Sequence, residues 1–212
     1  LLAYAAGNSA TSYSIPEGVT SIEKYAFYGC SGLTSITLPS TLTSIGNNAF
    51  QSCNGLTSIT IPEGVTSIGT SAFFSCSNLA SISLPDNLIS IGNSAFSGCS
   101  SLTSITIPEG VTSIGSPAFY SCRKLTEITI NGNISTLGSS AFSGCANLTK
   151  STLGAGVTSI PSNLFSPNML TRLTEIVVHG DLNSKTFPTG TWLKDGATVT
   201  SFTGAGTYTK QA

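Results

Sequence analysis

Charged residues are scarce in this chain, whose 212 residues include only eight basic and nine acidic side chains. That is 8%, against about 25% in an ordinary soluble domain. With a net charge of −1 there is no basic surface to neutralise phosphates, so we expect no nucleic-acid partner. One histidine and nine scattered carboxylates supply few acids or bases for catalysis. No apolar run approaches the roughly 18 residues of a membrane span, so we expect no membrane insertion.

Serine (35 residues), threonine (29) and glycine (22) dominate the composition instead. The 40% hydrophobic content is too high for a disordered chain. The sequence repeats itself every 23 residues, which is typical of stacked repeat architectures. Three columns mark this period: Phe27, Phe50, Phe73, Phe96, Phe119, Phe142 and Phe165; Cys30, Cys53, Cys76, Cys99, Cys122 and Cys145; and Leu33, Leu56, Leu79, Leu102, Leu125 and Leu148.

The period divides most of the chain into seven consecutive units, the last of which carries two extra residues. We expect one elongated repeat domain over residues 1–178, with an N-terminal cap in 1–15 and seven repeats in 16–178. Residues 179–212 break the period and are predicted to form a C-terminal cap of the same structural domain, with Trp192 in its core. The units are 16–38, 39–61, 62–84, 85–107, 108–130, 131–153 and 154–178.

Each unit contains two extended stretches and one compact turn. Ile59 and Ile61 are two residues apart and point to one face of a strand, which Pro62 ends because proline has no N–H for the ladder. Residues 65–68 predict a second short strand, and the apolar spacing within 72–79 suits one turn of 3₁₀ or α helix. Because one coil cannot bury its own apolar face, the copies must stack, and we predict an α/β, mostly β, solenoid.

The consensus P-x-x-[VL]-x-S-I-G-x-x-A-F-x-x-C-x-x-L-x-S-I-x-[IL] resembles the BspA-like (Treponema pallidum-type) leucine-rich repeats of bacterial surface proteins. The resemblance covers about residues 13–182, and its Ala-Phe-x-x-Cys core recurs in six units. It implies a right-handed leucine-rich-repeat superhelix with a parallel β-sheet on the concave face and short 3₁₀/α turns on the other side. It also implies a secreted or cell-surface bacterial adhesin that contacts host or partner-cell proteins.

The six cysteines admit two interpretations. An even number suggests disulfides, but one cysteine at the same position of every coil would form a column of parallel side chains, which argues against bonding between them. We therefore expect buried free thiols that act as small hydrophobes. No Cys-x-x-Cys or histidine cluster accompanies the column, so we expect no metal site and no cofactor.

The outward positions of the main strand are the candidate binding residues, because leucine-rich repeats present this sheet to their partners. Most of them carry small hydroxyls. Glu127, Lys150 and Glu175 alternate in sign on adjacent strands, which suits either cross-strand stabilisation or a polar contact patch. The candidates are Ser58, Thr60, Ser81, Ser83, Ser104, Thr106, Glu127, Thr129, Lys150, Thr152 and Glu175.

A second period of 46 residues is visible, since units one, three and five begin Pro-Glu-Gly-Val and carry an aromatic residue after the core phenylalanine. These aromatic residues are Tyr28, Phe74 and Tyr120. They form either an adhesive row on the flank of the rod or the mark of a duplicated two-unit block whose aromatic rings pack over neighbouring coils.

The sequence thus predicts a non-catalytic, monomeric protein-binding module. No G-x-S-x-G, H-E-x-x-H or phosphate-loop motif occurs, so we expect no enzyme and no catalytic residues. The alternative function is a structural spacer or stalk that presents another module and binds nothing itself. A further domain or an anchor in a longer protein would favour the spacer, whereas binding by the isolated chain would favour the adhesin.

Overall fold

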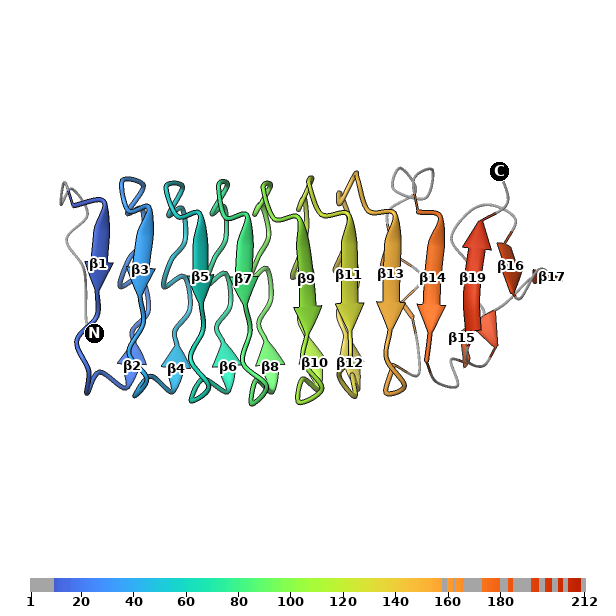
Figure 1. Cartoon of the computed structure of the whole chain (residues 1–212), viewed down its shortest axis with the longest axis horizontal. Coiled ribbons are helices and arrows are strands. Elements are labelled where there is room, and N and C mark those ends of the chain that lie inside the picture. Colours follow the sequence, from blue (N-terminus) through green and yellow to red (C-terminus); the bar gives the residue numbers. More distant parts are fainter. Residues whose placement is uncertain are drawn as a thin grey trace.

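The computed structural model describes residues 10–157, 160–161, 163–165, 173–179, 183–184, 192–194, 197–199, 202–203 and 206–210. The coils stack along one axis, and their strands stand in a nearly straight row (Figure 1). No helix long and apolar enough to cross a membrane occurs in this part of the chain. The predicted solenoid of 23-residue coils with parallel strands is confirmed.

Two rows of strands run along the rod. We call the longer strands the main row and the two-residue strands the second row. The main row holds β1 (Ser12–Ser14), β3 (Ser35–Thr37), β5 (Ser58–Thr60), β7 (Ser81–Ser83), β9 (Ser104–Ile107), β11 (Glu127–Ile130), β13 (Lys150–Leu153) and β14 (Glu175–Val178). The second row holds β2 (Ser21–Ile22), β4 (Ser44–Ile45), β6 (Ser67–Ile68), β8 (Ser90–Ile91), β10 (Ser113–Ile114) and β12 (Thr136–Leu137).

The register follows the repeat, because paired residues of successive coils are 23 positions apart up to β13, and 25 apart between β13 and β14, where the last unit carries two extra residues. Tyr13 pairs with Ile36, and Ile128 pairs with Ser151, both in parallel strands. The second row is one continuous six-stranded sheet. The main row is divided into the pair β1–β3, the pair β5–β7 and a longer sheet that contains β9, β11, β13 and β14.

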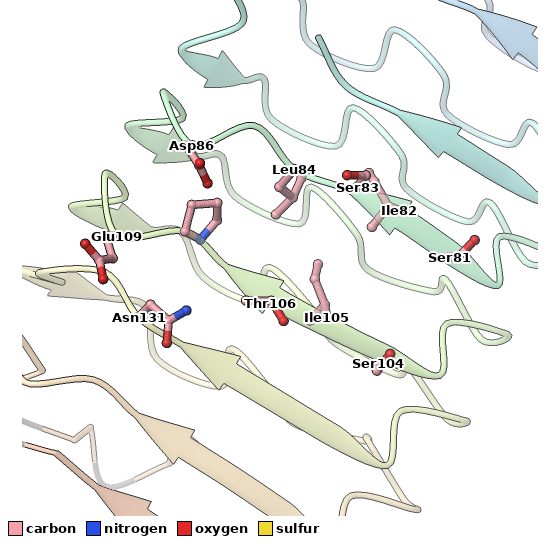
Figure 2. Close-up of a pocket in the computed structure, with 11 residues that line it drawn as sticks. Ser81, Ile82, Ser83, Leu84, Asp86, Ser104, Ile105, Thr106, Glu109 and Asn131 are labelled. Atoms are coloured by element: carbon pink, nitrogen blue, oxygen red, sulfur yellow. The ribbon is translucent and has the colours of Figure 1, made fainter. Parts of the chain in front are cut away.

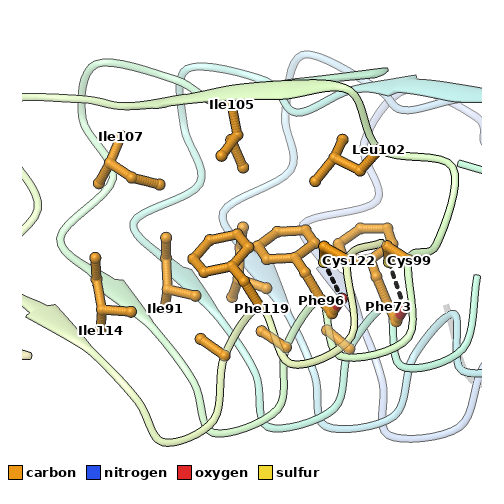
Figure 3. Close-up of a cluster of buried hydrophobic side chains, with 14 of the residues drawn as sticks. Phe73, Ile91, Phe96, Cys99, Leu102, Ile105, Ile107, Ile114, Phe119 and Cys122 are labelled. Carbon is orange, nitrogen blue, oxygen red and sulfur yellow. Dashed lines mark hydrogen bonds between the residues drawn. The ribbon is translucent and has the colours of Figure 1, made fainter. Parts of the chain in front are cut away.

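The core is a set of columns that run the length of the rod. The seven column phenylalanines stack face to face, with ring centroids 5.1–6.0 Å apart. The predicted column of buried free thiols is confirmed. Each thiol from the second coil onward donates to the carbonyl of the phenylalanine one coil earlier, as Cys99 Sγ does to Phe73 O at 3.2 Å (Figure 3). Burial raises the pKa of the Cys99 thiol to about 12, so the thiol stays protonated at neutral pH.

The predicted 3₁₀ or α turn is wrong, since the described residues contain no helix. Two residues in most coils take a left-handed conformation, such as Ser71 (φ 54°) and Ser75 (φ 57°), and a right-handed helix cannot continue through them. Alternate N–H groups also leave the coil: Ser71 N donates to Asn93 O, whereas Phe74 N donates to Ser71 O. The segment is therefore a series of turns closed by i+3 to i backbone hydrogen bonds. Further backbone hydrogen bonds join it to the next coil.

The fifth coil departs from this pattern because Pro117 occupies the first left-handed position and has no N–H to donate. The preceding hydroxyl takes over the missing bond, as Ser116 Oγ donates to the carbonyl of Ser139 in the next coil. A side chain thus replaces a backbone donor, and the stacking contact is kept.

Antiparallel strands extend the main row at its C-terminal end. β19 (Gly206–Lys210) pairs with β14, and β16 (Trp192–Lys194) pairs with both β19 and β17 (Ala197–Val199). A separate small pair joins β15 (Asn183–Ser184) to β18 (Phe202–Thr203). The side chain of Tyr208 is fully buried, whereas that of Trp192 lies outside the described part. The division into N-terminal cap, repeats and C-terminal cap stays a prediction.

Ser151 is the place where the core pattern fails. It pairs with Ile128 on one side and Ile176 on the other, is fully buried, and its Oγ has no hydrogen-bond partner among the described residues. A buried hydroxyl without a partner costs about 1–3 kcal/mol. We expect Ser151→Val to raise the free energy of unfolding by about 1–2 kcal/mol, because it removes that cost and adds apolar burial.

Urea denaturation of the two proteins measures this difference. The matched control is Ser58→Val, which makes the same change on an exposed strand position and should shift stability by no more than about 0.5 kcal/mol. A loss of stability in Ser151→Val would mean that the hydroxyl has a partner, such as a buried water.

Candidate binding face

The predicted binding residues all lie on the outward side of the main row. In β5, Ser58 and Thr60 are exposed while Ile59 between them is buried, and β3 and β9 alternate in the same way. In β7 the inward Ile82 is partly exposed, and in β13 and β14 the outward residues are partly rather than fully exposed. The face is lined by hydroxyls in the N-terminal coils and by charges only near its C-terminal end. The structure thus brings the eleven predicted residues onto one surface, although their role in binding stays a prediction.

The three charged candidates of this face are neighbours. The register places Lys150 between Glu127 and Glu175, and Lys150 Nζ lies 3.1 Å from Glu175 Oε1. The hydrogen bond and charge of Glu175 raise the pKa of Lys150, so the ammonium group of Lys150 stays protonated at neutral pH. The side chains are 41% and 34% exposed, and an ion pair this open contributes less than about 1 kcal/mol. This pairing favours the stabilising interpretation over a free contact patch.

The main row is interrupted at two places, where adjacent strands are not joined by ladder hydrogen bonds. We call the gap between β3 and β5 the first seam and the gap between β7 and β9 the second seam. At the second seam, the bond from Thr103 N to Ala80 O is 3.3 Å long, whereas Ala80 N lies 2.8 Å from Thr57 O in the intact pair before it. No ladder pairing joins the strands beyond that bond.

Each seam coincides with a groove. The groove of the second seam has a volume of about 680 Å³ and runs from Ser81 and Ser104 at one end to Asp86 and Glu109 at the other (Figure 2). The groove of the first seam has a volume of about 650 Å³ and includes Ser35, Ser58 and Glu63 at the positions equivalent to Ser81, Ser104 and Glu109. Ser40 stands at the position of Asp86, and the second carboxylate of this groove is Glu17 from the preceding corner. The binding face is therefore hollowed at two places, two coils apart.

The strands that precede the two seams differ from the strands that pair with the next coil in the residue at which the strand ends. Leu38 and Leu84 precede the seams and are partly exposed, whereas Ile61 and Ile107 at the same position are buried. Leucine fits a pleated strand less well than β-branched isoleucine does. Leucine alone does not open the ladder, because Leu153 is buried in a paired strand. Leu153 is followed by glycine, and only the two seams combine this leucine with a following proline.

Sequence reasoning found the face but missed the seams. A signal was present, since Leu-Pro alternates with Ile-Pro at the strand ends with the same 46-residue period as the Pro-Glu-Gly-Val corners. The loss of pairing could not be derived from it, because isolated Leu-Pro steps are compatible with a continuous edge.

The other candidates contribute little. Tyr28 and Tyr120 are about half exposed and Phe74 is less so, which leaves both interpretations of the aromatic row open. No group of three or more His, Cys, Asp or Glu side chains that could hold a metal occurs in the described part of the chain.

Stacked 23-residue coils with one parallel strand each on a common face define a leucine-rich-repeat solenoid. The model of the BspA type leucine rich repeat region, in six copies, matches residues 3–100 and 74–189. The chain belongs to this family. Proteins of this class are generally protein-interaction modules and typically non-enzymatic scaffolds.

Solved structures show the same architecture. The chain is similar to the Treponema pallidum leucine-rich-repeat protein TpLRR, with a TM-score of 0.59, 27% identity, and coverage of 66% of this chain and 79% of that one. A leucine-rich-repeat protein from Bacteroides ovatus gives a TM-score of 0.56 and 31% identity, with 79% of this chain and 49% of that one covered. This chain therefore spans about half of that relative's length.

The pneumococcal vaccine antigen PcpA is similar in fold, with a TM-score of 0.53 and 18% identity over 87% of this chain and 59% of that one. No curated protein sequence matches the chain.

Proposed function

We propose that the chain is a non-catalytic protein-binding module of a secreted or cell-surface bacterial adhesin, and that its partners are host or partner-cell proteins. The observation that carries this proposal is the outward face of the main row, where exposed small hydroxyls surround two grooves. Small polar side chains let a partner approach closely and form hydrogen bonds at low entropic cost.

The alternative is a spacer that holds another module at a distance. It is favoured by the Lys150–Glu175 pair, which uses the charges of the face internally. The family membership is compatible with either, since a solenoid can separate modules as well as bind partners.

Substitution of two serines on the outward face of the main row by arginine tests the proposal. We expect Ser81→Arg/Ser104→Arg to weaken binding to purified host extracellular-matrix proteins by about tenfold or more, because two long cations would fill the contact surface between β7 and β9. Surface plasmon resonance with the folded chain measures the affinities.

The control is Thr66→Arg/Ile89→Arg, which adds the same two charges at exposed positions beside the second row. Binding that is equally weak in both variants would show that the face is not the site. Absence of binding by the folded wild-type chain to any matrix protein would favour the spacer.

A further inference from the structure

The two seams share a chemical design. Each has an apolar floor, made in the second seam by Ile82, Leu84 and Ile105 and in the first by Ile36, Leu38 and Ile59. Each has hydroxyls at the end where the strands begin and two carboxylates at the opposite end (Figure 2). In the second seam both carboxylates come from the corners that follow β7 and β9, whereas in the first seam Glu63 follows β5 and Glu17 reaches in from the corner after β1. A ligand with an aliphatic stem and a cationic end fits such a groove, because the stem can pack on the apolar floor while the charge lies beside the carboxylates.

The carboxylates of the second seam are available to a partner. Asp86 and Glu109 are exposed, and within the described part of the chain neither carboxylate accepts a hydrogen bond or pairs with a cation. Figure 2 shows both at one end of the groove, with Asn131 beside Glu109. Both carboxylates line the same end of one groove, so a cation bound there would be attracted by both.

The carboxylates of the first seam are held in position. Glu17 accepts bonds from the backbone N–H and the hydroxyl of Ser40, at 3.2 and 3.1 Å, and Glu63 accepts the N–H of Asp86 at 3.2 Å. An ionised carboxylate has about four acceptor sites, so each group can still receive a donor from a partner. These bonds orient the acids before any partner arrives.

The N-terminal half supplies no cation of its own to the grooves. Lys24 is the only basic residue before residue 120, against five acidic ones. Its Nζ lies 4.8 Å from the centroid of the Tyr25 ring, and Lys24 lines neither groove. The four groove carboxylates therefore carry an uncompensated negative charge that favours a basic partner.

The spacing of the seams restricts the conformation of that partner. The seams are two coils apart, and coils at the spacing of sheet strands give about 10 Å. A polyproline II helix repeats every three residues, or about 9.3 Å, with every third side chain on one side. Same-side residues of a β-strand recur at about 7 Å, which does not fit one coil or two.

We propose that the two seams bind basic side chains of a polyproline II segment of a partner protein, which carries lysine or arginine at every third residue and lies along the rod. The aliphatic stems pack on the groove floors, and the charged ends reach the corner carboxylates. This inference rests on the proposed protein-binding function and specifies the chemistry of the partner.

The probe is an acetylated peptide of four Pro-Pro-Lys triplets, titrated into isotope-labelled protein and followed by amide chemical shifts. We expect the shifts to be concentrated at residues 35–63 and 81–109. Glu109→Gln should weaken binding about threefold and Asp86→Asn/Glu109→Gln about tenfold, as expected for exposed ion pairs. Glu23→Gln makes the same charge change away from the grooves and should alter the affinity by less than about 1.5-fold.

A second peptide has the same four lysines at every fourth residue. Binding of this peptide as tight as that of the triplet peptide would overturn the spacing argument. If Glu23→Gln and Glu109→Gln weaken peptide binding equally, the peptide is attracted only by the overall negative charge, and the grooves are not its binding site. If the triplet peptide fails to bind while Ser81→Arg/Ser104→Arg still abolishes binding to matrix proteins, this inference falls and the proposed function stands.

Discussion

Replacing Phe96 by alanine is expected to lower the free energy of unfolding by about 3–5 kcal/mol, towards the upper end of that range. Phe96 is fully buried at the centre of the rod, with its ring 5.4 Å from Phe73 and 5.3 Å from Phe119. The substitution therefore removes two stacking contacts together with the burial of one side chain, and neighbouring coils fixed by backbone bonds cannot collapse into the cavity. Its carbonyl would still accept the thiol of Cys122.

Urea denaturation of the variant tests this expectation, with Tyr120→Ala as the control. Tyr120 is 46% exposed, so its truncation should cost less than about 1 kcal/mol. Because each coil contacts only its neighbours, a central gap also weakens the coupling between the two ends of the rod. We expect a lower m-value or a second transition in Phe96→Ala. A cost similar to that of Tyr120→Ala would contradict the stacking argument.

The sequence predicts the stacking of this fold well because the repeat specifies it many times. The phenylalanine, cysteine and leucine columns recur together in the first six coils, and a shift of register would misalign all of them at once. The outward candidates follow directly, since side chains alternate along a strand. A single coil would have predicted neither the register nor the face.

The errors concern features that depend on backbone geometry between coils. The apolar spacing within 72–79 fits a helical turn, and nothing in it reveals that Ser71 and Ser75 are left-handed. Serine has no strong preference for that conformation, which the bonds to the next coil impose. The seams likewise arise from how two coils fit together, so local sequence patterns do not determine them.

Gly92→Ala is expected to destabilise the protein by about 3 kcal/mol or more, although it adds only one methyl group. A Cβ atom at this position would lie 2.6 Å from Thr70 N and 2.7 Å from Gly69 C, both of them backbone atoms of the preceding coil. Gly92 N also donates to Ile68 O at 2.9 Å, which fixes the approach of the two coils. The methyl group can be accommodated only if the coils move apart.

That separation would strain contacts beyond the substituted residue. Moving the coils apart stretches the second-row pairing of Ile68 with Ile91 and the stacking of Phe73 on Phe96. The same close approach recurs along the corner column at Gly46, Gly69, Gly115 and Gly138. Glycine is therefore required here by the distance between coils.

Gly32→Ala is the matched control, because a Cβ atom there meets nothing within 4 Å. It should leave stability unchanged or raise it by up to about 1 kcal/mol, since alanine has less conformational entropy than glycine in the unfolded chain. Thermal or urea denaturation of the two variants measures the difference between them. If Gly92→Ala is no less stable than Gly32→Ala, the coils can separate at low cost, and backbone contact at the corners does not set their spacing.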